Sequence, residues 1–260
     1  MNKSAIHIEN ICFAYETEMI LKHMSLDIAP NRICFVMGNN GSGKTTLLKN
    51  ILGFLFPQKG IIQIAGKNVS DIDSKAMSRL ISYVPQAIHL NTDFSVIDYV
   101  SLGRTPHMGI LTQLTDEDFQ IIEKISMLLG VDEMYETPFN KLSGGQKQIV
   151  AIARSLVQDT PIIVMDEPMS ALDIGKQVEL LKVLHGLAEN GKTIILTTHN
   201  PNHAVVLDSD SCFIKQGEIF AFGRSSDIIQ DTLLREIYGD NITLDHGKKG
   251  IMIVFDMSAV

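Results

Sequence analysis

The chain has 260 residues, 45% of them hydrophobic and 20% charged, so it can bury a core and is not disordered as a whole. Its formal net charge of −8 argues against a broad basic surface for nucleic acid, because phosphate contacts need clustered Lys and Arg. Three scattered cysteines without a CxxC pair argue against a disulfide framework or a structural zinc site, and they predict buried free thiols in a reducing compartment. No apolar run approaches the roughly 18 residues of a membrane helix, so we expect a chain that does not cross a bilayer.

Alternating polarity and short apolar runs predict several strands in the first third of the chain. These strands are expected at residues 5–13, 24–28, 32–37, 60–65 and 81–84. The run at 32–37 is apolar throughout, which is typical of a strand buried on both faces. Helices are expected at about residues 44–52 and 71–80.

A change of pattern follows, because residues 95–137 carry apolar side chains at helical spacing on both sides of a loop that contains Gly103 and Pro106. This segment predicts a mostly helical insert. Further helices are then expected at 145–157, 174–189 and near 226–238, and further strands at 162–165, 193–197 and 251–255. A hairpin is expected at 211–222, with its turn at Gln216-Gly217. Buried strands that alternate with helices favour an α/β fold with a parallel core sheet.

A glycine-rich segment joins the buried strand at 32–37 to the helix that follows it. It reads Gly38-Asn39-Asn40-Gly41-Ser42-Gly43-Lys44-Thr45, which matches G-x-x-x-x-G-K-[ST]. Glycines let backbone N–H groups surround a phosphate, Lys44 adds a positive charge, and the Thr45 hydroxyl can bind Mg²⁺. The segment predicts a nucleotide phosphate site, without choosing between a kinase, a GTPase and an ATPase.

Two acids, Asp166 and Glu167, end the apolar strand expected at 162–165. Carboxylates at the carboxyl edge of a parallel sheet lie beside ligands bound there. Asp166 is therefore a candidate for holding Mg²⁺ through its water shell, and Glu167 for polarising an attacking water. The alternative is a strand end that only caps the next helix.

A second possible anion site precedes the helix expected at 145–157. It reads Leu142-Ser143-Gly144-Gly145-Gln146, in which small residues expose backbone N–H groups at a helix start. The chain thus carries two phosphate-recognising helix starts, and a generic P-loop kinase does not explain the second one.

The motifs, taken in order, resemble those of ATP-binding cassette (ABC) ATPases over roughly residues 5–240. In this resemblance Tyr15 is the aromatic that stacks on adenine, Gln86 is the Q-loop glutamine and His199 is the switch histidine. Residues 170–173 are similar to the D-loop. The resemblance implies catalytic roles for Glu167, His199 and Gln86.

The same resemblance implies two cofactors, ATP and Mg²⁺. It assigns Mg²⁺ to Thr45, Gln86 and Asp166. It assigns the nucleotide to residues from every motif, with signature residues acting on the ATP of a second cassette. These residues are Tyr15, Gly38, Asn39, Asn40, Gly41, Ser42, Gly43, Lys44, Thr45, Thr46, Ser143, Gly144, Gly145, Gln146 and Asp173.

The fold implied by the resemblance is an α/β P-loop NTPase (RecA-like) core with an N-terminal antiparallel β subdomain. A helical subdomain at about residues 87–141 is inserted between the Q-loop and the signature. The resemblance implies one ABC ATPase domain over residues 1–240, followed by a C-terminal tail at 241–260. Because the chain holds one cassette, we expect it to form a homodimer or to pair with another cassette.

Two further segments are similar to importer ATPases for iron–siderophore complexes, haem and cobalamin. They are Val100-Ser101-Leu102-Gly103-Arg104-Thr105-Pro106-His107 and Leu234-Arg235-Glu236-Ile237-Tyr238-Gly239. Two departures from these importers are Asn200-Pro201-Asn202-His203 after the switch histidine, and Gln146 where many have Glu. The alternatives are an exporter ATPase subunit and a non-transport ABC ATPase.

The implied partners are integral membrane permease subunits and, indirectly, a periplasmic or lipoprotein substrate-binding protein, with no nucleic acid. The implied location is peripheral, at the cytoplasmic face of the cell membrane. Outside the motifs, Asp208 and Asp210 are expected to be solvated acids, and the histidines other than His199 to have no special role.

Overall fold

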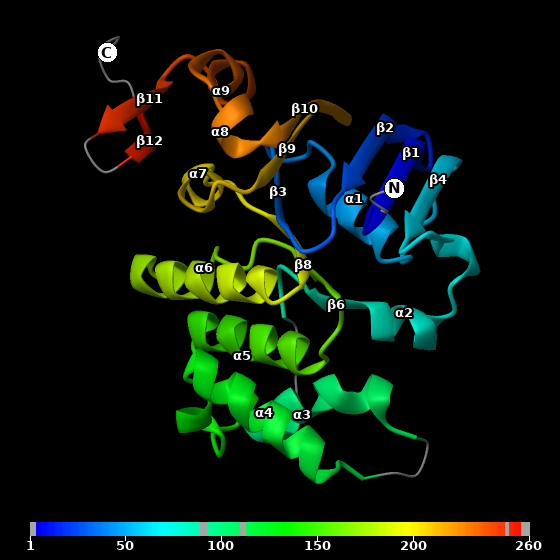
Figure 1. Ribbon diagram of the computed structural model, residues 1–260, viewed down its shortest axis with the longest axis vertical. Coiled ribbons are helices and arrows are strands. Elements are labelled where there is room, and N and C mark those ends of the chain that lie inside the picture. Colours follow the sequence, from blue (N-terminus) through cyan, green and yellow to red (C-terminus); the bar gives the residue numbers. More distant parts are fainter. Residues whose placement is uncertain (1–3, 89–92, 110–112, 248–249, 256–260) are drawn as a thin grey trace. The chain divides into compact units, whose positions relative to one another are not determined.

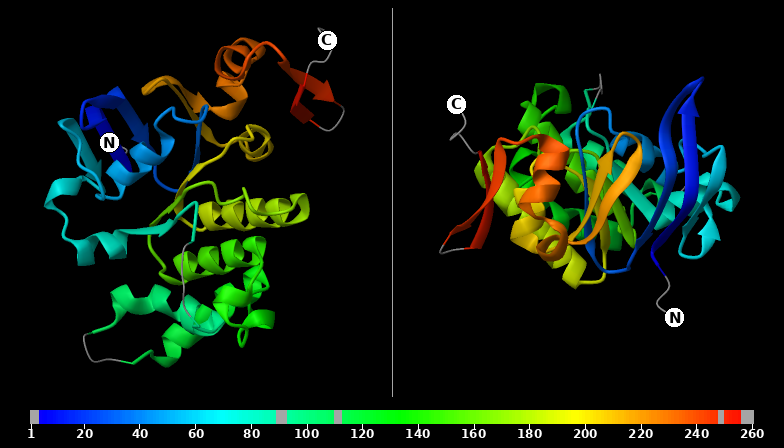
Figure 2. Two further views of the ribbon diagram at one scale, coloured as in Figure 1. Left: turned by 180° about the vertical axis from the view of Figure 1, so that it is seen from behind. Right: turned by 90° about the horizontal axis from the view of Figure 1, so that it is seen from above.

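The computed structural model describes residues 4–88, 93–109, 113–247 and 250–255. The chain divides into two compact units, the first comprising Met1–Ile72 with Thr193–Val260 and the second Asp73–Lys192. The elements of both are labelled in Figure 1, and Figure 2 gives two further views. Within the described ranges, no helix combines the length and apolar character needed to cross a membrane.

An antiparallel sheet opens the first unit. Its strands, in the order β2-β1-β4-β5, are Glu18–Ile28, Ile6–Tyr15, Lys59–Ile64 and Lys67–Asn68. Alternate apolar residues on these strands are buried, among them Ile6 and Ile8 on β1. The antiparallel β region expected at the N-terminus is therefore present.

A second sheet in the first unit is built around β3 (Ile33–Met37), whose residues are all buried. β3 pairs in parallel with β8 (Thr193–Thr197) and with β9 (Asp210–Lys215), and β10 (Glu218–Arg224) continues antiparallel to β9. Helix α1 (Lys44–Ile51) follows β3 after the glycine-rich loop. The expected strand–loop–helix arrangement and the hairpin at Gln216-Gly217 are confirmed.

The C-terminal part of this unit differs from the prediction. The prediction of a single helix near 226–238 was wrong, because the chain forms two helices there. They are α8 (Ser225–Ile228) and α9 (Asp231–Tyr238), with an extended break at Ile229 and Gln230. Burial of the Ile229 side chain stabilises this break. The last strand is present as β12 (Gly250–Phe255). Its antiparallel partner β11 (Ile242–Gly247), the 3₁₀ turn η1 (Val69–Asp71) and the short α7 (Asn202–Leu207) were not expected.

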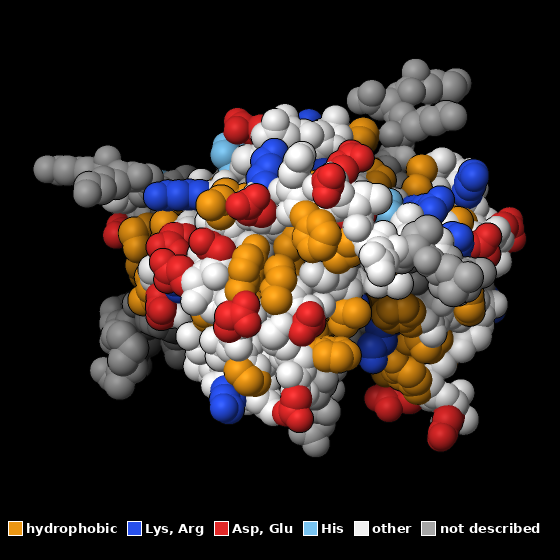
Figure 3. Space-filling model, turned by 90° about the horizontal axis from the view of Figure 1, so that it is seen from below, with side chains coloured by type: hydrophobic (Ala, Val, Ile, Leu, Met, Phe, Trp, Pro, Cys, Tyr) orange, Lys and Arg blue, Asp and Glu red, His pale blue; other side chains and the backbone are white. Residues whose placement is uncertain are grey.

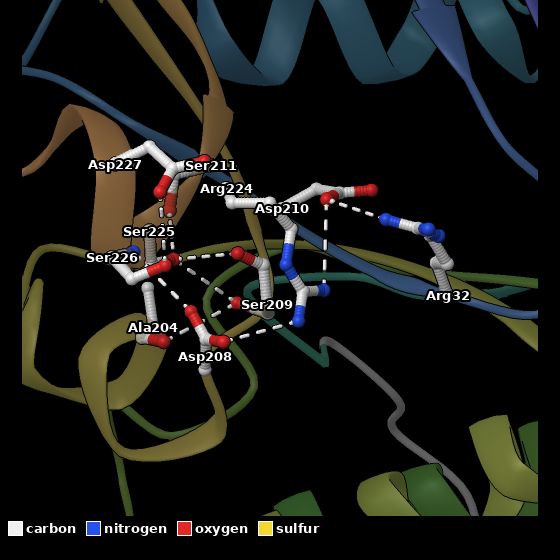
Figure 4. Close-up of polar contacts among 10 residues, drawn as sticks. All are labelled: Arg32, Ala204, Asp208, Ser209, Asp210, Ser211, Arg224, Ser225, Ser226 and Asp227. Carbon is white, nitrogen blue, oxygen red and sulfur yellow. Dashed lines mark hydrogen bonds and ion pairs between the residues drawn. The ribbon is translucent and has the colours of Figure 1, made fainter.

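Asp210 is a further correction, because it is buried and not a solvated acid. It lies 3.2 Å from the Arg32 guanidinium and 3.9 Å from that of Arg224, and these charges compensate for its loss of water (Figure 4). Asp208 is exposed, as expected. The three cysteines are free and buried, which confirms the prediction.

The second unit contains two strands and a set of helices. β6 (Ile81–Val84) and β7 (Ile162–Met165) pair in parallel. The helices are α2 (Ser74–Leu80), α3 (Val96–Ser101), α4 (Asp116–Leu129), α5 (Gly144–Val157) and α6 (Ile174–Glu189), with short 3₁₀ turns η2 (Leu102–His107), η3 (Asp132–Met134) and η4 (Phe139–Lys141). The mostly helical segment expected at 95–137 is confirmed over residues 95–109 and 113–137, and residues 110–112 lie outside the described residues.

Candidate functional site

The glycine-rich loop of the first unit wraps around the start of α1. Gly38 has φ +145°, and a Cβ there would lie 2.2 Å from the carbonyl oxygen of Ile214, so only glycine fits. Gly43 precedes the helix with φ 109° and no side-chain cap. The first N–H groups of α1 are therefore left for a ligand.

Two side chains inside this loop have polar atoms suited to phosphate. Lys44 is only 6% exposed, and its Nζ donates to the carbonyl oxygens of Gly38 at 2.8 Å and Asn39 at 3.0 Å. The Ser42 hydroxyl is buried and has no hydrogen-bond partner among the described residues. The buried Lys44 ammonium would bind more strongly to a negatively charged acceptor than to these carbonyl oxygens. The unpaired Ser42 hydroxyl could also donate to such a ligand, so both groups favour an anion at this position.

Tyr15 ends β1 and is 43% exposed, with its ring edge-on to Phe13 at 4.9 Å between centroids. The exposed ring can accept a flat apolar group. β2, the partner of β1, lies against the loop, because a Cβ on Gly43 would be 2.9 Å from Leu21.

His199 follows β8 in an exposed position. Since β8 pairs in parallel with β3, and the Thr198 N–H donates to the Val36 carbonyl at 3.2 Å, His199 and the glycine-rich loop leave the same edge of this sheet. The structure thus brings these two predicted parts of the site together within the first unit.

His203, which the sequence analysis passed over, braces the His199 loop. Its Nδ1 lies 3.0 Å from the Thr198 hydroxyl and its Nε2 lies 3.4 Å from the Asn200 amide, while the Asn200 N–H donates to the Thr198 hydroxyl at 3.1 Å. Burial lowers the pKa of His203 below its ordinary value, which favours the neutral ring. The i, i+4 spacing of His199 and His203 across a helix start was the only signal in the sequence.

In the second unit, β7 ends at Asp166, which is 1% exposed, and its backbone N–H donates to the Val84 carbonyl at 2.8 Å. Glu167 follows with φ 49°, a strained conformation for this residue type. The Gln86 amide donates to Glu167 Oε2 at 2.9 Å. Gln86 and Glu167, which are 81 positions apart, are therefore brought together, with the carboxylate held in a set orientation.

The signature residues begin α5. Ser143 is its N-cap and forms a capping box with Gln146: the Ser143 Oγ accepts from the Gln146 N–H at 3.3 Å, and Gln146 Oε1 accepts from the Ser143 N–H at 2.9 Å. Gly144 has open space where a Cβ would lie, whereas a Cβ on Gly145 would be 3.0 Å from the Ala171 carbonyl. The Gln146 side chain thus accepts the Ser143 N–H in the capping box, as a Glu at this position would.

Asp173 lies close to the signature. It caps α6 by accepting the Lys176 N–H at 2.9 Å. A cavity of about 360 Å³ is lined by signature and D-loop residues together, including Ser143, Gly145, Gln146 and Asp173. The structure therefore assembles a second surface from two segments that α5 and β7 separate in the sequence.

The importer-like segment at 100–107 lies inside the second unit and has a structural role. A Cβ on Gly103 would lie 2.2 Å from the Arg154 carbonyl, which shows how closely η2 packs on α5. The buried Arg104 donates to Asp118 at 2.7 Å and to the Val157 carbonyl at 2.8 Å. The segment fixes the far end of the helix that the signature begins.

The predicted site residues fall into two groups. Tyr15, residues 38–46 and His199 belong to the first unit, and Gln86, residues 143–146, Asp166, Glu167 and Asp173 belong to the second. Among the described residues, no group of three or more His, Cys, Asp or Glu side chains forms a metal cluster.

Comparison with known proteins identifies the family of this chain. The family model of the ABC transporter matches residues 21–170. The petrobactin import ATP-binding protein of Bacillus subtilis (strain 168) is 32% identical over 95% of this chain and 98% of its own length. The chain therefore belongs to the ABC transporter family and is an ATP-binding, ATP-hydrolysing subunit.

Solved structures agree with the sequence match. An inward-facing metal-chelate type ABC transporter superposes with a TM-score of 0.82 at 28% identity, over 97% of this chain and 96% of that chain. A dimeric ATP-binding cassette in a post-hydrolysis state, bound to ADP and Pi, superposes with a TM-score of 0.76 at 28% identity, over 85% and 98% of the two chains. The P-loop fold and the family resemblance predicted from the sequence are thus confirmed.

Proposed function

We propose that this subunit hydrolyses ATP to energise the uptake of a metal chelate, such as an iron–siderophore complex, haem or cobalamin, through a separate membrane permease. The observation that carries the nucleotide part is the uncapped start of α1, where the buried Lys44 rests on the carbonyl oxygens of its own loop. Phosphate oxygens are stronger acceptors than these carbonyls, so Lys44 turns to the ligand. The unpaired Ser42 hydroxyl joins it.

In this proposal Thr45, Gln86 and Asp166 hold Mg²⁺. Their hydroxyl, amide and carboxylate oxygens fit a cation that prefers oxygen ligands and keeps several waters. Bound Mg²⁺ neutralises charge on the β- and γ-phosphates. Asp166 is suited to this role because its buried carboxylate follows directly on the strand β7.

Glu167 is proposed to orient and polarise the attacking water, and Gln86 to position the Glu167 carboxylate through their 2.9 Å hydrogen bond. His199 is proposed to contact the γ-phosphate from the loop after β8. Tyr15 is proposed to stack on adenine with its exposed ring.

Two copies of the chain are proposed to pair head to tail around two ATP molecules. Ser143, Gly145 and their neighbours on the second unit then act on the γ-phosphate bound by the partner's glycine-rich loop. Support comes from the exposed capped start of α5 and from the dimeric form of the related cassette bound to ADP and Pi. Loss of the γ-phosphate removes the charge that links the halves, so closure and opening drive the permease.

The permease is proposed to dock on the helical part of the second unit. Helix α4 exposes large apolar side chains there: Phe119 by 52%, Met127 by 62% and Leu128 by 51%. Figure 3 shows hydrophobic side chains gathered among acidic ones on the face it draws. Large apolar side chains exposed along one helix support a protein partner for this part of the unit. The subunit then lies peripherally at the cytoplasmic face of the membrane, and a substrate-binding protein delivers the chelate to the permease.

The catalytic assignment is tested with Glu167→Gln, which keeps the Gln86 contact possible but removes the base. We expect turnover to fall by about 10²- to 10⁴-fold while ATP binding is retained, so that an ATP-bound dimer accumulates in size-exclusion chromatography. Glu218→Gln is the matched control, because Glu218 is an exposed carboxylate whose side chain makes no hydrogen bond or ion pair with another described residue. Unchanged hydrolysis in Glu167→Gln would remove Glu167 from the proposed mechanism.

The transport assignment needs the membrane partner. The subunit is co-purified with its permease, placed in proteoliposomes with ATP on the subunit side, and assayed with a ferric siderophore and with the iron-free siderophore. Import predicts ATP-dependent accumulation of the ferric complex alone. Import delivers the complex to the subunit's own side of the membrane, so accumulation on the opposite side would assign the chain to an exporter.

A further inference from the structure

The helix α7, which begins three residues after His199, is attached to the C-terminal hairpin at its first residue. The Asn202 Oδ1 accepts the Ile253 N–H at 2.7 Å, and the Asn202 Nδ2 donates to the Ile253 carbonyl at 3.2 Å. A single side-chain amide thus satisfies both backbone groups of one residue in β12. A paired contact of this kind fixes both distance and orientation.

The contact uses the free side of β12. Ile253 lies opposite Leu244 in the antiparallel β11–β12 pair. Both backbone groups of one strand residue point to the same side, so those of Ile253 face α7 and leave the β11 ladder intact. Asn202 therefore binds an open strand edge at a single point.

The hairpin is in turn joined to α9. Asp231, the first residue of α9, accepts from the Thr243 hydroxyl at 2.9 Å and from the Leu244 N–H at 2.7 Å. These bonds hold the pKa of Asp231 below its ordinary value. Thr243 and Leu244 belong to β11, so α9 and the hairpin move as one segment.

The same segment reaches the phosphate loop. The Asn39 Nδ2 donates to the Ile237 carbonyl at 2.7 Å, which satisfies one of the last carbonyl groups of α9. The described residues of α9 and the hairpin, 231–247 and 250–255, thus contact the loop that holds Lys44 through Ile237 and the helix that follows His199 through Ile253.

The far end of α7 is also fixed, but by α8 (Figure 4). Asp208 accepts from the Ser226 N–H at 3.2 Å and from Arg224 at 3.1 Å. The Ser225 hydroxyl donates to the Ser209 carbonyl at 2.7 Å. The first turn of α7 is held by His203 on the side of Thr198 and Asn200, and by Asn202 on the side of the hairpin.

We infer that residues 231–247 and 250–255 form a positioning element for ATP hydrolysis, and that Asn202 is the positioning residue that couples this element to His199. The Asn202 N–H donates to Asn200 Oδ1 at 3.1 Å, so a shift of Asn202 moves the loop that carries His199. The inference rests on the proposed contact of His199 with the γ-phosphate. Because Lys44 and its loop bind the phosphates separately, Asn202 acts on turnover and leaves ATP affinity unchanged.

The test compares full-length variants by steady-state ATP hydrolysis and by ATP titration. Asn202→Ala removes both bonds, and Ile253→Pro removes the N–H donor without touching the β11 ladder. We expect each to lower kcat about fivefold, with KM for ATP within about twofold of the parent, as for the loss of about 1 kcal/mol of hydrogen bonding. Asn241→Ala is the matched control, because Asn241 is exposed and its side chain makes no hydrogen bond with another described residue.

Two double variants separate positioning from general destabilisation. Asn202→Ala with Ile253→Pro is expected to lose no more than either alone, because both remove one contact. In the His199→Ala background, Asn202→Ala is expected to cause no further loss of kcat. Additive losses, or an equal rise of KM in Asn202→Ala, would overturn the inference.

The outcome for His199→Ala distinguishes two failures. If His199→Ala leaves kcat intact, the proposed role of His199 is wrong and the inference falls with it. If His199→Ala lowers kcat and Asn202→Ala does not, the inference alone is wrong.

Discussion

The starts of α1 and α5 are both built as anion sites, but they satisfy their backbone N–H groups differently. α1 follows Gly43, which supplies no side-chain cap, and the buried Lys44 ammonium donates to two carbonyl oxygens of its own loop. α5 follows Ser143, which forms a closed capping box with Gln146. One helix start is incomplete without a ligand, whereas the other is stable alone and exposed.

This difference suggests a division of labour. A helix start with unpaired N–H groups and a buried ammonium binds phosphate within one chain. A capped helix start exposes only its outer N–H groups and hydroxyl, so it is suited to a ligand that is already held elsewhere. The proposed head-to-tail pair uses the two starts in this order.

The largest effect on ATP binding is expected for Lys44→Ala, set against Ser143→Ala. Removal of a charged phosphate contact costs about 2 kcal/mol or more, so ATP affinity should fall at least about thirtyfold in Lys44→Ala. Ser143→Ala should leave ATP affinity within about twofold and lower turnover alone. Fluorescence titration with ATP measures the affinity of each variant, and a hydrolysis assay measures its turnover. An equal loss of ATP affinity in both variants would contradict the different roles proposed for the two helix starts.

Glycine substitutions sharpen the same comparison. Gly38→Ala places a Cβ 2.2 Å from a backbone carbonyl at φ +145°, so we expect a loss of stability of about 3 kcal/mol or more together with weaker ATP binding. Gly144→Ala meets open space and should melt within a few degrees of the parent. Thermal unfolding with and without ATP measures both. A stable, ATP-binding Gly38→Ala would contradict the close packing of the loop.

A smaller effect concerns the end of α5 far from the signature. Asp118→Asn leaves the buried Arg104 without its counter-charge, at a cost of about 3 kcal/mol. The N–H and hydroxyl of Thr115 and the Arg104 charge lower the pKa of Asp118 from 3.8 to about 2. Its stabilising contribution is therefore complete above pH 3.8 and lost as the pH falls through about 2.

Asp116→Asn is the matched control for this prediction, because Asp116 is exposed in the first turn of the same helix. Chemical denaturation at pH 7 should show a lower unfolding free energy for Asp118→Asn alone. Equal stability of the two variants would show that the Arg104–Asp118 pair does not anchor α5.

The smallest effect is a dependence of stability on pH, caused by His203 next to the His199 loop in the first unit. Burial lowers the pKa of His203 below 6.5, so the unfolded chain binds the proton more readily than the folded chain. Stability should be complete above pH 6.5 and should fall as the pH drops below that value. His203→Gln should flatten this part of the curve of melting temperature against pH, and an unchanged slope would show that His203 does not contribute.

Local sequence was enough to predict the parts of the site that depend on neighbouring residues. The run from Ile33 to Ile51 combines a buried strand, a glycine-rich turn and a helix in one continuous segment, and each follows from residue type. The same holds for the Ser143 capping box, whose two partners are three positions apart. Positions 226–238 misled the prediction because helical spacing continued across Ile229, whose burial stabilises an extended break.

The length and charge of the chain, together with its motifs, determined the family, the phosphate loop and the candidate acids. Only the tertiary structure decided which distant groups meet: Gln86 with Glu167 across 81 positions, and Asn39 with Ile237 across 198. It also decided that Asp210 is buried between Arg32 and Arg224, and that Asn202 contacts the C-terminal hairpin. Periodicity and motif spacing report on a residue's own segment, whereas these contacts depend on the pairing of strands whose positions the local pattern does not encode.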